Sequence, residues 1–344
     1  MSTPRDHQRA IRVRIMAAIA GALILIALAG QFIGQPAQPR SDLTGRPVLP
    51  GFAEVRAAAS AIRVTLADET YSLAATPDGW RLTSADGYPI RPDRLTELAE
   101  GLGSLVWDAP RTRDPEKFNA IGLGDPREGG TGALVEVLGP DGEVAAALIT
   151  GRKDEHIYAR RPGDAQAFRV KGSLPPLYSA EAWLDLDILQ LSEDAVSAVR
   201  LIDRTGASLY LRRNVGAGNG AFRPAPPYEA YELVSRLAPA GPGLALTRLQ
   251  PVGVKPAAAL TTQPAARHIT ETHDGLEIDV RGYREADGYY LTLRAVEAGE
   301  GANRAGAINQ RASGWAFRIT EIDWSDFAPL VSSIARPPAG GAED

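Results

Sequence analysis

The chain has 344 residues, of which 44% are hydrophobic and 23% charged, the composition of a folded protein long enough for two domains of common size. Cysteine is absent, which excludes disulfides, thiolate metal sites, a cysteine nucleophile and the lipidated cysteine of a bacterial lipoprotein. The formal net charge is −5, and residues 1–14 carry +3, so the rest carries −8. This acidic remainder predicts neither a nucleic-acid partner nor a basic face for anionic lipid.

The first predicted element is a transmembrane helix from Ile15 to Gly34, IMAAIAGALILIALAGQFIG, in which Gln31 is the one polar residue. These twenty residues would rise about 30 Å as a helix, the thickness of the hydrocarbon core of a bilayer. Positive residues beside a membrane span stay in the cytoplasm, and four arginines precede this one. We therefore expect residues 1–14 to be a cytoplasmic tag on a single-pass protein of a bacterial inner membrane, with the C-terminal domain in the periplasm. The arginines are Arg5, Arg9, Arg12 and Arg14.

The alternative to this anchor is a signal peptide cleaved after Ala29, because residues 27–29 (ALA) resemble a signal-peptidase site. The apolar run continues through Phe32 and Ile33, further than a typical signal sequence, so we expect the anchor to be retained. Residues 35–51 follow and hold four prolines. They predict an extended, semi-rigid spacer between the bilayer and the folded part.

A first α+β unit is expected over residues 52–184. Its strands are predicted from alternating apolar residues and from Asp-Gly turns. A helix is expected to begin at Pro92, because proline suits a first helical turn and a leucine stripe follows it. The stripe is Leu95, Leu98, Leu102 and Leu105. The expected strands lie around residues 62–66, 71–73, 80–83, 133–138, 144–150, 157–160 and 167–170.

The pattern then repeats, which predicts a second α+β unit over residues 187–330. An amphipathic helix led by Pro227 (PYEAYELVSRL) would correspond to the one led by Pro92. Several matches in one order favour two tandem, duplicated units of antiparallel strands with few short helices. A disordered tail is expected at 336–344. The matches are SAIRV (60–64) with SAVRL (197–201) and AFRV (167–170) with AFRI (316–319).

Four loose motifs carry a family resemblance. They are GWR at 79–81, NAIGLGDP at 119–126, WLD at 183–185 leading into a strand at 196–199, and FRI at 317–319 before an amphipathic helix near 327–334. Through them the chain resembles the DUF4340 domain-containing proteins, a bacterial family of unassigned function, over most of residues 52–334. The resemblance implies one N-terminal membrane helix. It also implies an accessory role beside an ABC-type transport system, because family genes often neighbour genes of such systems.

The residues themselves predict no catalytic, cofactor-binding or metal-binding site. His268 and His273 are the one close pair of histidines, and their odd separation points the rings to opposite faces of a strand. We expect both to be surface or turn residues. Residues 151–155 (GRKDE) lack the spacing of a phosphate-binding loop and predict a charged hairpin turn.

Acidic pairs and tryptophans have a structural and a functional interpretation. Asp185 with Asp187, and Asp323 with Asp326, could act as acid and base or hold Ca²⁺. Acidic residues near helix starts more commonly cap free amides, and we expect that role here. The five tryptophans predict core anchors, with room for one of them in a binding groove.

Two functions are compatible with this sequence. The first is a membrane-anchored, non-enzymatic periplasmic module, an accessory of an ABC-type transport or envelope complex, with the bilayer and proteins of that complex as partners and no cofactor. The alternative is an anchored envelope hydrolase or ligand-binding protein whose site assembles from distant residues. A flat apolar patch would favour the first and a deep polar pocket the second.

The predicted orientation can be tested with a reporter fused after Asp344. The fusion should be active in the periplasm, because the arginine-rich end is held in the cytoplasm. Replacing all four arginines before the apolar run by glutamate should lower the fraction of chains in this orientation. A fusion active only in the cytoplasm would contradict it.

Overall fold

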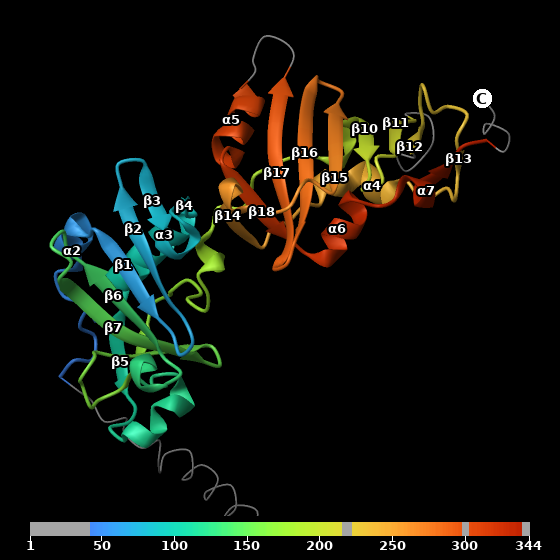
Figure 1. Ribbon diagram of the computed structural model, residues 1–344. Helices are drawn as coiled ribbons and strands as arrows, with labels where there is room; N and C mark the ends of the chain where they lie inside the picture. Colours follow the sequence, from blue (N-terminus) through green and yellow to red (C-terminus); the bar gives the residue numbers. More distant parts are fainter. Residues whose placement is uncertain (1–41, 215–221, 298–302, 339–344) are drawn as a thin grey trace, which may run out of the picture. The chain divides into compact units, whose positions relative to one another are not determined.

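The computed structural model describes residues 42–214, 222–297 and 303–338 (Figure 1). The predicted cytoplasmic tag, the predicted membrane span and residues 339–344 of the predicted tail lie outside these ranges. Within them, no helix is long and apolar enough to cross a membrane.

Mostly antiparallel sheets and a few short helices make this an α+β fold, as the sequence predicts. One sheet has nine strands in the order β4-β3-β2-β1-β6-β7-β8-β9-β5. Its strands are β1 (Ala61–Thr65), β2 (Thr70–Thr76), β3 (Gly79–Leu82), β4 (Tyr88–Pro89), β5 (Val106–Pro110), β6 (Ala133–Leu138), β7 (Val144–Lys153), β8 (His156–Arg160) and β9 (Phe168–Lys171).

The other large sheet has eight strands in the order β12-β11-β10-β15-β16-β17-β18-β14. A two-stranded ribbon pairs β13 with β19. The strands are β10 (Val196–Ile202), β11 (Ser208–Arg213), β12 (Phe222–Pro224), β13 (Glu232–Leu233), β14 (Gly253–Pro256), β15 (Ala266–Thr272), β16 (Leu276–Glu285), β17 (Gly288–Glu297), β18 (Trp315–Ile319) and β19 (Ala335–Arg336). The helices are α2 (Phe52–Ala58), α3 (Pro92–Ser104), α4 (Ala240–Leu244), α5 (Asn303–Ala312), α6 (Glu321–Phe327) and α7 (Val331–Ile334).

The described chain divides into two compact units. The first comprises residues 42–59, 63–70 and 97–175, and the second comprises residues 60–62, 71–96 and 176–338. The first contains a cluster of buried side chains where a loop covers β6, β7 and β8. This cluster is Phe118, Leu123, Leu134, Ile149, Tyr158 and Ala167.

The helix predicted to begin at Pro92 is confirmed as α3, which starts there and ends at Ser104. Leu98 and Leu102 of its leucine stripe are buried, as is Leu105 just after the helix. The strands predicted at 133–138, 144–150 and 157–160 are confirmed as β6, β7 and β8. Local apolar spacing therefore identifies these elements correctly.

The helix predicted over residues 227–237 is wrong, because this segment forms turns and the short strand β13. Residues 232 and 233 of this segment pair with β19 in a two-stranded ribbon, which requires extended backbone. The aromatic residues of the segment pack on the core of the eight-stranded sheet. Tyr228 and Tyr231 both contact that core, and their rings meet edge-to-face. The amphipathic helix expected near 327–334 is likewise two short helices, α6 and α7, separated at Pro329.

Part of the predicted spacer packs on the first unit. The backbone N–H of Gly45 donates to the carbonyl of Trp107 at 2.7 Å, and that of Val48 to the carbonyl of Leu105 at 2.9 Å. Val48 is fully buried, and Arg161 donates to its carbonyl at 3.0 Å. Residues 45–48 thus lie along the edge of β5.

Apart from β4, which has no counterpart, the two large sheets share one strand order. In each, the first strand lies in the interior, between the next strand of the chain and a strand from much further along. Strands β1, β2, β3 and β5 occupy the positions of β10, β11, β12 and β14, and β6 to β9 those of β15 to β18. This order supports the predicted duplication of 52–184 and 187–330, which itself stays a prediction.

Burial along β1 and β10, which hold equivalent positions in the two sheets, can be tested by mutation. Val64 and Leu201 are 0% and 3% exposed, so Val64→Asp and Leu201→Asp would each bury an unpaired carboxylate. We expect each to lower the free energy of unfolding by roughly 3 kcal/mol or more.

The neighbouring arginines provide the controls. Arg63 forms a half-exposed ion pair with Glu136 at 3.4 Å, and Arg200 is exposed beside Tyr210. Arg63→Ala and Arg200→Ala should each change stability by about 1 kcal/mol or less. Urea unfolding of the full chain in neutral detergent measures all four variants. Aspartate variants as stable as the alanine variants would contradict the inward orientation.

Candidate functional site

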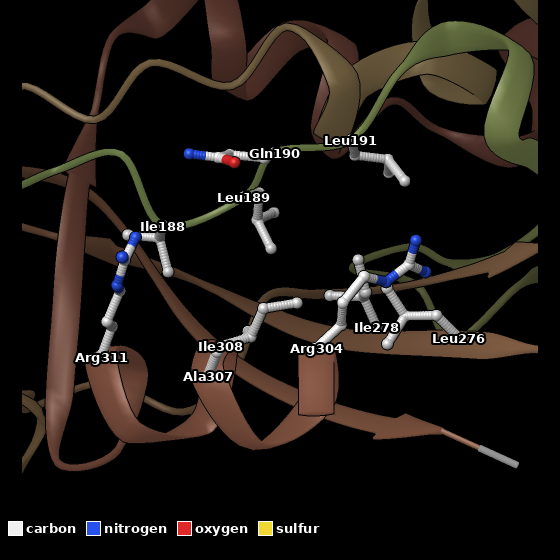
Figure 2. A pocket seen from close by; sticks show the side chains of 10 residues that line it. All are labelled: Ile188, Leu189, Gln190, Leu191, Leu276, Ile278, Arg304, Ala307, Ile308 and Arg311. Carbon is white, nitrogen blue, oxygen red and sulfur yellow. The ribbon is translucent and has the colours of Figure 1, made fainter. Parts of the chain in front are cut away.

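A groove in the second unit lies between α5, the start of β16 and the extended residues 188–191 (Figure 2). Its volume is about 200 Å³. Figure 2 shows Leu189 directed toward Ile308 of α5, with Leu276 and Ile278 of β16 beside them. The groove is therefore built from three stretches that are far apart in the sequence.

The floor of the groove is apolar. Ile278 is fully buried, and Leu276 and Ile188 are 3% and 4% exposed. Leu276 and Ile278 project from β16 of the eight-stranded sheet, and Ile188 comes from the extended segment. The floor thus offers van der Waals contact and no hydrogen-bonding group.

Helix α5 is attached to β17 by the hydrogen bonds of one polar side chain and by an apolar face. The Asn309 carboxamide accepts the backbone N–H of Ala295 at 2.8 Å and donates to the carbonyl of the same residue at 2.8 Å. Ala305, Ile308 and Ala312 form the buried face of the helix. This spacing of three and four residues explains why a run rich in glycine and alanine forms a helix here.

Two arginines of α5 stand at the rim of the groove. Arg304 and Arg311 are seven residues apart, which is two turns, so they lie on the same side of the helix. Arg304 forms ion pairs with Asp274 at 3.0 Å and Glu297 at 3.6 Å. Arg311 donates to the backbone carbonyl of Asp187 at 2.7 Å.

These contacts determine what the groove can hold. The charge of Arg304 is balanced by two carboxylates of the protein, so Arg304 offers no excess positive charge for an anion. Arg311 is held at the rim by its hydrogen bond to the backbone carbonyl of Asp187. A volume of about 200 Å³ is also below the range of roughly 300–1,000 Å³ that is usual for small-molecule pockets. One or two apolar side chains of a protein partner fit this slot best.

A second hollow of about 400 Å³ lies beside the turn between β10 and β11. Tyr228, Tyr231 and Val331 line it, and Asp203 stabilises its wall by accepting the backbone N–H of Val331 at 2.8 Å. Burial alone would raise the pKa of Asp203, but hydrogen bonds from Thr205, Val331 and Ala207 hold it below its ordinary value. This carboxylate is thus a structural clamp.

The two predicted histidines lie apart. His268 is fully buried, so the expectation of a surface position is wrong for it. Its Nε2 lies 2.8 Å from the carbonyl of Pro242, and its ring stacks on Phe327 at 5.5 Å. His273 lies exposed in the turn after β15. The two rings are separated, as predicted, but β15 directs the ring of His268 into the core.

The acidic pairs do not form a joint site. Asp323 caps α6 in a reciprocal capping box with Thr320, which confirms the predicted structural role for that residue. Asp187 lies beside the groove, where its carboxylate accepts from Gln190 at 3.2 Å. Within the described ranges, no group of three acidic or histidine side chains could hold a metal ion.

The charged stretch at 151–155 is confirmed as a hairpin turn between β7 and β8. Trp107, Trp183 and Trp324 are core residues, between 1% and 7% exposed. The indole N–H of Trp183 donates to the Tyr71 hydroxyl at 2.9 Å. No tryptophan lines the groove of Figure 2.

The NAIGLGDP motif at 119–126 forms a tight loop over β7. The Asn119 carboxamide accepts the backbone N–H of Thr131 at 3.0 Å, and a Cβ on Gly151 would collide with the carbonyl oxygen of Gly122. Arg160, 6% exposed, donates from Nε to the carbonyl of Leu123 at 2.9 Å. The motif thus has a packing role in this structure.

The environment of His268 predicts a pH-dependent stability. Burial lowers the pKa of His268 from 6.5 to about 4, although its hydrogen bond to Pro242 acts in the opposite direction. Between these values the unfolded chain binds a proton that the folded chain excludes, so stability should fall as pH drops from 6.5 to 4. The loss would be roughly 3 kcal/mol at most.

The measurement is urea unfolding of the full chain at several pH values in neutral detergent. His268→Asn removes the titrating group, so its stability should change much less over this range, whatever its absolute value. The same pH dependence in both proteins would contradict the role of His268.

Residues 80–240 match a family model described as Domain of unknown function (DUF4340). The matched region begins in β3, includes the NAIGLGDP loop and ends at the start of α4. Comparisons with curated proteins and with solved structures give no match. The motif resemblance and the match agree, and the chain is a DUF4340 domain-containing protein.

Proposed function

We propose that this protein is a membrane-anchored, non-enzymatic periplasmic module that serves as an accessory of an ABC-type transport or envelope complex. One observation carries the proposal: an arginine-flanked apolar run from Ile15 to Gly34 that is long enough to span a bilayer. The family resemblance contributes the association with ABC-type transport.

The spacer limits how far the folded part can be from the membrane. Ten residues, 35–44, separate the apolar run from Gly45, which is hydrogen-bonded to β5. A fully extended chain of this length spans at most about 35 Å. Under the proposal, the β5 edge stays within that distance of the bilayer, close enough to meet the membrane subunits of a transporter.

The groove of Figure 2 supports docking over catalysis. Its apolar floor, with the ion-paired Arg304 at the rim, suits an apolar side chain of a subunit of the complex better than a polar substrate. Ala307 is exposed at the rim, so Ala307→Trp would fill the slot from outside without changing the floor. Gln310→Trp provides a matched control, because Gln310 is exposed on the same helix and does not line the groove.

The test is purification of the full chain, tagged after Asp344, from membranes in mild detergent. We expect mass spectrometry to identify a permease or ATPase subunit of an ABC-type system. Ala307→Trp should reduce its recovery at least several-fold, and Gln310→Trp should leave it unchanged.

Two results would overturn the proposal in different ways. A soluble chain whose intact mass corresponds to a start at Gly30 would show that the anchor is cleaved. A membrane-retained chain without any ABC-type subunit would show that the accessory role is wrong.

A further inference from the structure

One face of the eight-stranded sheet is rich in arginine. Side chains alternate between the two faces of a strand, and the register of the pairs shows which residues share a face. Arg281 of β16 pairs with Arg267 of β15, and Arg294 of β17 pairs with Asp279 of β16. We call this side of the sheet the arginine face, defined by Arg200, Arg212, Arg223, Arg267, Arg281, Arg294 and Arg318.

The helices cover the opposite face. Leu201, which pairs with His268, belongs to the core cluster that includes Val331 and Ile334 of α7. His268 lies against Pro242 of α4 and Phe327 of α6. Helix α5 packs on the same side, where Ile308 meets Ile278 at the groove. The arginine face is thus the side away from these four helices.

The positive charge on this face is only partly balanced. Four carboxylates, Glu271, Glu277, Asp279 and Glu285, share the face with its seven arginines. Arg267 forms a two-bond ion pair with Asp279, with both distances 2.8 Å. Within the described part of the chain, Arg281, Arg294 and Arg318 form no ion pair, and all three are exposed.

One pairing within this face opposes the stability of the sheet. Arg267 and Arg281 are direct cross-strand partners, and like charges in such positions are destabilising. The composition of the chain predicts no basic face, and that expectation is wrong. Net charge averages over the whole surface, whereas strand alternation collects these arginines on one side.

We propose that the arginine face binds the phosphate groups of an anionic membrane surface. Charge complementarity requires an anionic partner, since the unpaired guanidinium groups can each form two hydrogen bonds with a phosphate. The sheet presents them in two dimensions, with about 4.8 Å between strands and about 6.8 Å between successive residues on one face. Such an array matches many headgroups in a surface better than one bound anion.

Two further observations favour lipid. Tyr210 and Tyr283 lie partly exposed on the same face, and tyrosine is enriched where proteins meet the membrane–water interface. The predicted anchor also brings the chain to a bilayer, so the inference rests on the proposed function in this respect. Each arginine near an anionic surface strengthens binding roughly fivefold at moderate salt.

The experiment holds the full chain in nanodiscs of phosphatidylcholine and adds sedimentable vesicles. Vesicles of phosphatidylcholine alone are compared with vesicles containing phosphatidylglycerol, at low and high salt. We expect sedimentation with the anionic vesicles only, and its loss at high salt as charges are screened. Empty nanodiscs should not sediment.

Two triple variants distinguish binding by the arginine face from binding by other positive charges of the same unit. Arg281→Gln, Arg294→Gln and Arg318→Gln combined should weaken binding on the order of a hundredfold. The matched control combines Arg204→Gln, Arg236→Gln and Arg284→Gln, which are exposed in the same unit, outside the arginine face, and it should bind like the unchanged chain. Thermal unfolding should find the first variant at least as stable as the unchanged chain, because Arg281 opposes Arg267.

No binding to anionic vesicles, or equal weakening by both triple variants, would overturn the proposal. So would binding to beads coated with poly-glutamate but not to the vesicles, which would make this a face for an acidic protein. Failure of the chain to enter nanodiscs refutes the anchor instead. In that case the soluble chain is tested directly with the same vesicles.

Discussion

Each large sheet is organised around a strand that lies in its interior. Strand β10 pairs with β11, its neighbour in the chain, and with β15, so that Ile202 meets both Ser208 and Arg267. The second pairing closes a long loop, which is entropically costly and makes the sheet a cooperative unit. The register of β10 also fixes both faces. A slip by one residue would turn Arg200 toward the helices and Leu201 toward water.

The elements that the sequence predicts correctly are those whose signals are local. Strand β6 and helix α3 each carry an apolar pattern that fits one structure, and α3 also begins with a favourable proline. The segment at 227–237 shows the opposite case. Its amphipathic spacing is compatible with a helix, but β13 pairs with β19, whose residues are distant in sequence. Tertiary pairing overrides local preference there.

The candidate groove was not predictable in the same way. Its parts come from residues 188–191, from β16 and from α5, and no single stretch contains a recognisable motif. The helical spacing of Ala305, Ile308 and Ala312 was the one available signal, and the surrounding glycines and alanines obscure it. The arginine face poses a related problem, since its residues become neighbours only once six strand pairings are known. Both features depend on topology more than on motifs.

The attachment of residues 45–48 to β5 changes where the first unit begins. A fragment that started at Phe52 would keep every strand of the sheet and still expose the backbone N–H of Trp107, which now donates to the carbonyl of Arg46 at 3.0 Å. An uncovered sheet edge is a template for pairing with another chain. The short segment after the spacer therefore also protects the protein against edge-to-edge aggregation, and a soluble version of this domain has to include it.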